Sequence, residues 1–214
     1  MTSPEGPSRR GIIALAVILV AAMAAWVLWP RDRPDLVVVG DSVTFLSIPA
    51  IEDELGDDFD LSIRAYPGQA SNDLTLVVLQ ELVERDAVDE QVDAIALLVG
   101  YNDVLRFRDR PDEVEELVAL AADASCGVVL AVPAPPEWSD QEDFAAVRAA
   151  FAEYGDRLEA EVERHDHLHH VTSWQEAVEA SGPGELVDTD GVHPVEAGQR
   201  ALARAYSESV RRYC

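Results

Sequence analysis

The stretch LVVVGDS, residues 36–42, decides the fold of this chain. Its four apolar residues run without polar alternation, which is typical of a strand covered on both faces of a sheet. A glycine, an aspartate and a serine follow at once, and the serine is placed to open the next helix. Apolar runs at residues 94–99 and 127–132, with weaker ones at 61–65 and 168–171, predict further strands of the same kind.

The segments between these runs have helical spacing. Apolar residues recur every three or four positions at residues 112–124 and 144–162, and a last helix is expected to start at Pro194, because proline is favoured in a first turn. Strands that alternate with helices predict a parallel sheet with right-handed crossovers. We therefore expect a three-layer α/β/α sandwich over residues 36–214.

The amino-terminal residues form a separate region. A short tail, residues 1–10, precedes an uncharged run of 19 residues, 11–29. A helix of that length spans about 28 Å, close to the hydrocarbon thickness of a bilayer. Trp26 and Trp29 stand at its end, where indole rings favour the membrane interface. These features predict one transmembrane helix, joined to the domain by a tether at residues 30–35.

A cleavable signal peptide is the competing interpretation of this region. Ala22-Met23-Ala24 offers a small-x-small cleavage site. We favour a retained anchor, because cleavage would leave the apolar residues 26–29 on the mature terminus. Arg9 and Arg10 predict a cytoplasmic tail, which places the domain outside the cell membrane. If the segment is cleaved, the domain is secreted.

Composition limits the classes of partner. The 214 residues are 48% hydrophobic and 27% charged, as in a globular domain, with 16 basic and 41 acidic residues and a net charge of −25. A field of that sign repels nucleic acid and anionic headgroups, so neither is an expected partner.

Three loops that follow predicted strands carry candidate catalytic groups. Ser42 would be a nucleophile whose backbone N–H also helps to hold an oxyanion, and Gly68 and the Asn102 amide would supply two further donors. Each residue also has a structural alternative: Ser42 as a helix N-cap, Gly68 in a plain Pro-Gly turn, and Asn102 in an Asx turn.

The segment before the last helix supplies a base. Asp190 lies three residues before His193, across a glycine, and can hold one imidazole nitrogen so that the other accepts the serine proton. The carboxyl ends of parallel strands meet at one edge, where such sheets bind ligands. The combination predicts a Ser42-His193-Asp190 triad.

These blocks resemble those of the SGNH hydrolases, also called the GDSL esterase and lipase family. Gly40-Asp41-Ser42 is similar to the first block, Gly68 to the second, residues 100–103 to the third and residues 190–194 to the last. The resemblance implies a flavodoxin-like, five-stranded parallel sheet and ester hydrolysis or acyl transfer without a metal or other cofactor. We therefore expect a serine esterase at the cell envelope that acts on small-molecule or glycan esters, acetyl esters among them. The alternative is an envelope acyltransferase, or a non-catalytic module that binds acylated glycans.

The remaining candidates concern cysteine and histidine. Two cysteines cannot form a four-thiolate zinc site. Cys126 and Cys214 are expected to form a disulfide in an exported domain, the alternative being a buried cysteine and a frayed tail. The histidines of the segment 165–170 are a weak candidate for a metal site, and we expect none there.

Overall fold

The computed structural model describes residues 33–86, 92–106, 113–141 and 143–214. The chain divides into two units, Met1–Arg33 and Pro34–Cys214. The predicted anchor at residues 11–29 lies outside the described ranges. Within those ranges, no helix combines the length and the hydropathy needed to cross a bilayer.

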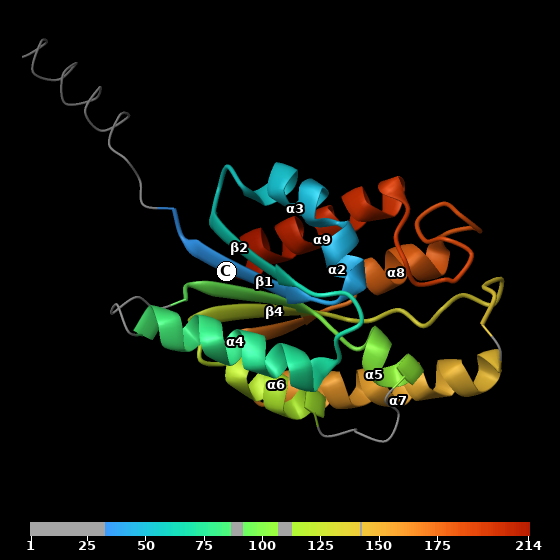
Figure 1. The fold of residues 1–214 in the computed structure, drawn as a ribbon, viewed down its shortest axis with the longest axis horizontal. Coiled ribbons are helices and arrows are strands. Elements are labelled where there is room, and N and C mark those ends of the chain that lie inside the picture. Colours follow the sequence, from blue (N-terminus) through green and yellow to red (C-terminus); the bar gives the residue numbers. More distant parts are fainter. Residues whose placement is uncertain (1–32, 87–91, 107–112, 142) are drawn as a thin grey trace, which may run out of the picture. The chain divides into compact units, whose positions relative to one another are not determined.

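One parallel sheet forms the centre of the second unit (Figure 1). Its strands are β1 (Asp35–Gly40), β2 (Asp60–Ala65), β3 (Ala94–Leu98), β4 (Cys126–Leu130) and β5 (Leu168–Val171). They lie in the order β2-β1-β3-β4-β5, and every neighbouring pair is parallel. The five strands predicted from the sequence are therefore confirmed, and they form one sheet.

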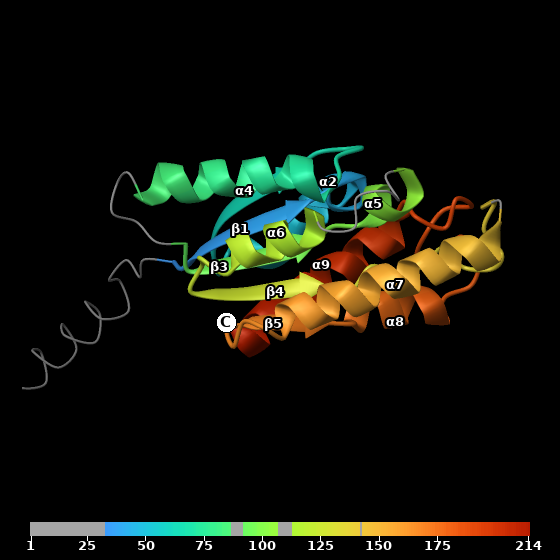
Figure 2. The ribbon, with the colours of Figure 1, turned by 90° about the horizontal axis from the view of Figure 1, so that it is seen from below.

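Helices cover both faces of the sheet, which confirms the three-layer sandwich (Figures 1 and 2). One layer contains α2 (Ser42–Leu46), α3 (Ile48–Leu55), α8 (Ser173–Ala180) and α9 (Glu196–Tyr213). The other contains α4 (Ser71–Asp86), α5 (Tyr101–Arg106), α6 (Glu113–Ala121) and α7 (Phe144–Val162). Because both faces are covered, the central strands are buried along their length: every residue of β3 is buried, and so are all residues of β1 after Asp35.

The register of the sheet brings the candidate loops together. Gly40, where β1 ends, is paired with Ala65 of β2 and with Leu98 of β3. The chain segments that follow these three strands therefore leave the sheet at one level, beside one another. The sequence predicted the catalytic groups at this edge of the sheet.

Two boundaries differ from the predicted ones for a reason that the structure shows. The last helix begins at Glu196 and not at Pro194, because Pro194 forms an isolated antiparallel bridge with Val187. Asp35, which the sequence assigned to the tether, is the first residue of β1: it is paired with Asp60, and its carboxylate binds Arg85 at 2.6 Å.

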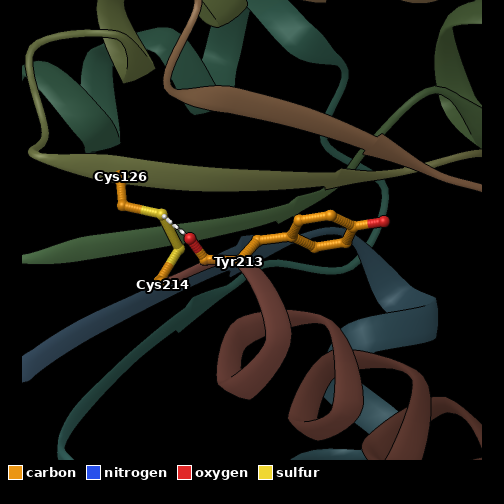
Figure 3. Close-up of a disulfide and its surroundings, with 3 residues drawn as sticks. All are labelled: Cys126, Tyr213 and Cys214. Carbon is orange, nitrogen blue, oxygen red and sulfur yellow. Dashed lines mark hydrogen bonds between the residues drawn. A yellow bond between two sulfur atoms is a disulfide. The ribbon is translucent and has the colours of Figure 1, made fainter.

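The structure joins Cys126 and Cys214 in a disulfide between the start of β4 and the end of α9 (Figure 3). The carbonyl oxygen of Tyr213 lies 3.4 Å from Cys126 Sγ, as a contact only, because a disulfide sulfur carries no proton to donate. The Tyr213 ring stacks on His169 with 4.4 Å between the ring centroids. The disulfide lies at the amino ends of the strands, away from the edge that carries Ser42.

The histidine segment has structural partners. His167 Nε2 is 2.8 Å from the carbonyl oxygen of Ala122, and His169 packs on Tyr213. Among the residues that the structure describes, no group of three or more histidine, cysteine or acidic side chains is placed to hold a metal ion.

Candidate active site

Ser42 is the first residue of α2, directly after β1. The helix is capped by Asp41, whose Oδ1 accepts a hydrogen bond of 3.0 Å from the backbone N–H of Val43. The N-cap role considered for Ser42 therefore belongs to Asp41, and the serine hydroxyl is left for another partner. Ser42 Oγ lies 3.0 Å from His193 Nε2, across 151 positions of sequence.

A tight turn holds Asp190 against His193. Asp190 Oδ1 accepts hydrogen bonds from the backbone N–H groups of Val192 and His193, at 2.8 and 3.0 Å, and Oδ2 lies 2.5 Å from His193 Nδ1. Gly191 has a φ of 71°, which favours glycine, and a Cβ at this position would lie 2.7 Å from Ser139 Cβ. The turn and its two backbone hydrogen bonds thus hold the Asp190 carboxylate in place independently of its contact with the imidazole.

The charge of Asp190 determines the tautomer of the histidine. Partial burial raises the pKa of Asp190, but the hydrogen bonds from His193 and from the two backbone N–H groups outweigh burial and hold this pKa below its usual value. At neutral pH the carboxylate is ionised and can only accept, so Nδ1 of His193 carries the proton. Nε2 is then an acceptor for the Ser42 hydroxyl.

Two residues of the same cavity lining, Ser42 and Gly68, carry backbone N–H groups that are candidate donors. Gly68 lies in the turn after β2 with a φ of 80°, a conformation that glycine adopts without strain. Within the described residues, no hydrogen bond engages the backbone N–H of Ser42 or of Gly68. Both groups are therefore free to donate to an incoming oxygen.

The Asn102 amide is already engaged. Its Nδ2 donates to the carbonyl oxygen of Gln69 at 2.9 Å and to Asp41 Oδ2 at 3.4 Å. The second bond is long and hence weak. Asn102 can supply an oxyanion donor by exchanging the bond to Asp41 for one to the oxyanion, while the bond to Gln69 holds the amide in place.

A buried carboxylate lies beneath this site, a feature that the sequence analysis did not single out. The pKa of Asp41 is raised to about 7: burial is the largest cause, the backbone hydrogen bond from Val43 offsets part of it, and the nearby charge of Asp103 adds to it. Asp103 is also buried and accepts the backbone N–H of Ser71 with both oxygens, at 3.0 and 3.2 Å. Two buried carboxyl groups with raised pKa values make the local charge beneath the candidate site depend on pH.

The predicted residues share one open cavity of about 520 Å³. Ser42, Gly68, Asn102, Asp190 and His193 all line it. The lining also includes Tyr101, Leu105, Arg106, Gln141 and Val192, which were not predicted from the sequence as site residues. Gln141 Nε2 donates to the backbone carbonyl of Asp190 at 3.0 Å and so supports the loop that carries Asp190. Its only sequence signal was its position in the loop after β4.

Comparison with known proteins identifies the family of this chain. The model of the GDSL-like lipase/acylhydrolase family matches residues 38–201, and the chain belongs to that family. No curated protein sequence matches the chain.

Solved structures share the fold. A GDSL-like lipase from Bacteroides thetaiotaomicron has a TM-score of 0.66 at 17% identity, over 92% of this chain and 98% of that one. A variant of Axe2, an acetyl xylan esterase from Geobacillus stearothermophilus, has a TM-score of 0.57 at 18% identity, over 84% and 97%. The C-terminal catalytic domain of Streptococcus pneumoniae peptidoglycan O-acetyltransferase A has a TM-score of 0.59 at 15% identity, over 86% and 93%. At these identities the likeness concerns the fold alone.

Proposed function

We propose that this protein is a serine esterase that hydrolyses carboxylic esters through Ser42, His193 and Asp190. The observation that carries the proposal is the unbroken chain of contacts from Ser42 Oγ to His193 Nε2, at 3.0 Å, and from His193 Nδ1 to Asp190 Oδ2, at 2.5 Å. His193 removes the hydroxyl proton while Ser42 Oγ attacks the ester carbonyl. Asp190 keeps the imidazole oriented and stabilises its cationic form.

The tetrahedral intermediate needs donors for its oxyanion. The backbone N–H groups of Ser42 and Gly68 and the Asn102 amide fill this role, because all three residues line the cavity into which the ester carbonyl must enter. When the intermediate collapses, protonated His193 gives its proton to the leaving alcohol, and Ser42 keeps the acyl group. Water, activated by the same imidazole, then releases the acid.

Acetyl esters are the first substrates to test. Family membership supports acyl-ester chemistry, and an acetyl xylan esterase is among the proteins with this fold. Acyl transfer is the second candidate, supported by the fold shared with a peptidoglycan O-acetyltransferase. Hydrolysis and transfer have the acyl-Ser42 intermediate in common and differ only in the acceptor, which is water or an alcohol.

We place the protein at the cell envelope, with the domain on the outer side of the membrane. The apolar run at residues 11–29 supports an anchor, or an export signal if it is cleaved. The Cys126–Cys214 disulfide supports the same location, because structural disulfides persist in oxidising compartments and are rare in the cytosol.

Turnover of 4-nitrophenyl esters of increasing acyl length tests the activity. We expect hydrolysis that is fastest for the acetyl ester, and a loss of at least about a thousandfold in S42A, because removal of a triad member leaves only the oxyanion donors and binding. S173A is the control, because Ser173 is exposed in the first turn of α8 and does not line the cavity. Wild-type turnover in S42A would refute the assignment of the nucleophile. No turnover at any acyl length would favour a non-catalytic binding module.

A further inference from the structure

Arg106 is a cation placed at the catalytic cavity. It is the last residue of α5, its side chain is exposed, and it lines the same cavity as Ser42 and His193. Its guanidinium group lies over Gly68: a Cβ built on that glycine would be 3.2 Å from Arg106 Nη1. The positive charge therefore sits beside one of the proposed oxyanion donors.

Arg106 differs from six of the other arginines that the structure describes, which are paired with carboxylates. In this acidic chain, Arg64, Arg85, Arg157, Arg164, Arg200 and Arg211 each form an ion pair with a carboxylate. Among the described residues, no carboxylate forms an ion pair with Arg106. Among the described lining residues, the other charged group is Asp190, which already binds His193. The guanidinium donors of Arg106 are therefore not engaged by any described carboxylate and are available to a bound ligand.

We propose that Arg106 binds a carboxylate carried by the ester substrate, and so selects anionic esters over neutral ones of the same size. The inference rests on the proposed esterase function. A guanidinium group matches the planar carboxylate with two parallel hydrogen bonds. One arginine neutralises a carboxylate of charge −1, whereas a phosphate dianion would keep a negative charge beside Asp190 with no second cation in the described lining.

The net charge of −25 does not oppose this capture at close range. At physiological ionic strength the Debye length is about 8 Å, so distant surface carboxylates are largely screened. A substrate in the cavity senses mainly the nearest groups, which are Arg106 and the Asp190–His193 pair. The acidic surface slows the encounter with an anion, and the contact with Arg106 retains the anion once it is bound.

The carboxylate can lie on the acyl side or on the alcohol side of the ester, and two pairs of substrates separate these cases. The acyl pair is 4-nitrophenyl hydrogen glutarate and neutral 4-nitrophenyl pentanoate. The alcohol pair is 4-acetoxybenzoate and its neutral methyl ester. The measurement is kcat/KM for the wild type and for R106Q on all four esters, after subtraction of the uncatalysed rates. R204Q is the control for net charge, because Arg204 is exposed on α9 and does not line the cavity.

We expect R106Q to lose about tenfold in kcat/KM on the carboxylate member of one pair, the low end for a charge-assisted hydrogen bond, because the guanidinium is exposed to solvent. We expect its neutral partner to change less than about twofold and R204Q to leave both unchanged, since a distant surface charge is screened. The pair that responds identifies the side that carries the carboxylate.

An equal loss on charged and neutral esters would overturn the inference and leave the esterase function standing, because Arg106 would then act on the oxyanion. Unchanged rates on all four esters in R106Q would overturn it as well. Absence of wild-type turnover on every ester would overturn the proposed function together with this inference.

Discussion

Replacement of Asn102 by alanine tests whether the amide supplies an oxyanion donor. Asn102 is 9% exposed, and its Nδ2 donates at 2.9 Å to Gln69 and at 3.4 Å to Asp41 in the free protein. The N102A variant removes these bonds and the proposed donation to the oxyanion. The two effects are separable, because the first concerns stability and the second concerns the transition state.

The size of the catalytic effect follows from an exchange of hydrogen bonds. One donor to an oxyanion contributes about 3–4 kcal/mol to lowering the barrier. Asn102 gives up its long bond to Asp41 in return, which costs less than about 1 kcal/mol. The net loss in N102A is about 3 kcal/mol, or about a hundredfold in kcat. KM should change little, because the oxyanion exists only after Ser42 has attacked.

Steady-state hydrolysis of 4-nitrophenyl acetate gives kcat and KM, and urea unfolding gives the free energy of unfolding of the same samples. We expect N102A to lose about 1–2 kcal/mol of stability with the bond to the Gln69 carbonyl. N72A is the matched control, because Asn72 lies in the first turn of α4 and outside the cavity lining, and its kcat should stay within about twofold. A folded N102A that keeps more than a third of the wild-type kcat would refute the oxyanion role.

Three further perturbations have defined outcomes. In D190N the side-chain amide donates to Nδ1 of His193 and forces the imidazole proton onto Nε2, so kcat should fall at least about a thousandfold at every pH from 5 to 9. A smaller loss of kcat in a pH–rate profile would contradict the assigned tautomer. The raised pKa of Asp41 means that the folded state binds more protons than the unfolded state between about pH 4 and 7, so this group should lower the free energy of unfolding by up to about 4 kcal/mol as the pH rises through that range. The D41N variant keeps an acceptor for the N-cap bond and should lack this decrease. Equal changes of the free energy of unfolding with pH in the wild type and in D41N, measured by urea unfolding, would contradict the raised pKa. Replacement of both Cys126 and Cys214 by serine should lower the free energy of unfolding by about 2–4 kcal/mol, because the disulfide closes a long loop, and should leave kcat unchanged, because the disulfide lies at the edge opposite Ser42. An unchanged midpoint in non-reducing urea unfolding would disprove its stabilising role.

The sequence predicted the sheet well, because buried parallel strands give continuous apolar runs that local patterns reveal. The start of the last helix was missed, since the bridge between Pro194 and Val187 is a tertiary contact that the favourable helix position of proline does not disclose. The anchor at residues 11–29 stays a prediction, as it lies outside the described residues.

The candidate site was predictable because Ser42, Gly68 and Asn102 each follow a strand and His193 comes shortly before the last helix. The contact of Ser42 with His193 follows from sheet topology, which brings residues 151 positions apart to one edge. The engagement of the Asn102 amide by Asp41 and Gln69 was not predictable, because it depends on side-chain orientations inside the edge. Arg106 was missed for a related reason: it ends a short helix, and sequence alone does not tell on which side of α5 it lies.

The most direct test of the account is the site of reaction with a fluorophosphonate, which phosphonylates an activated serine. Peptide mapping by mass spectrometry of the labelled protein should place one adduct on Ser42, and the rate of labelling should fall at least about a hundredfold in H193A, because the imidazole that removes the proton is gone. An adduct on another serine, or labelling of Ser42 at the same rate without His193, would contradict the claim that these two residues form the catalytic pair.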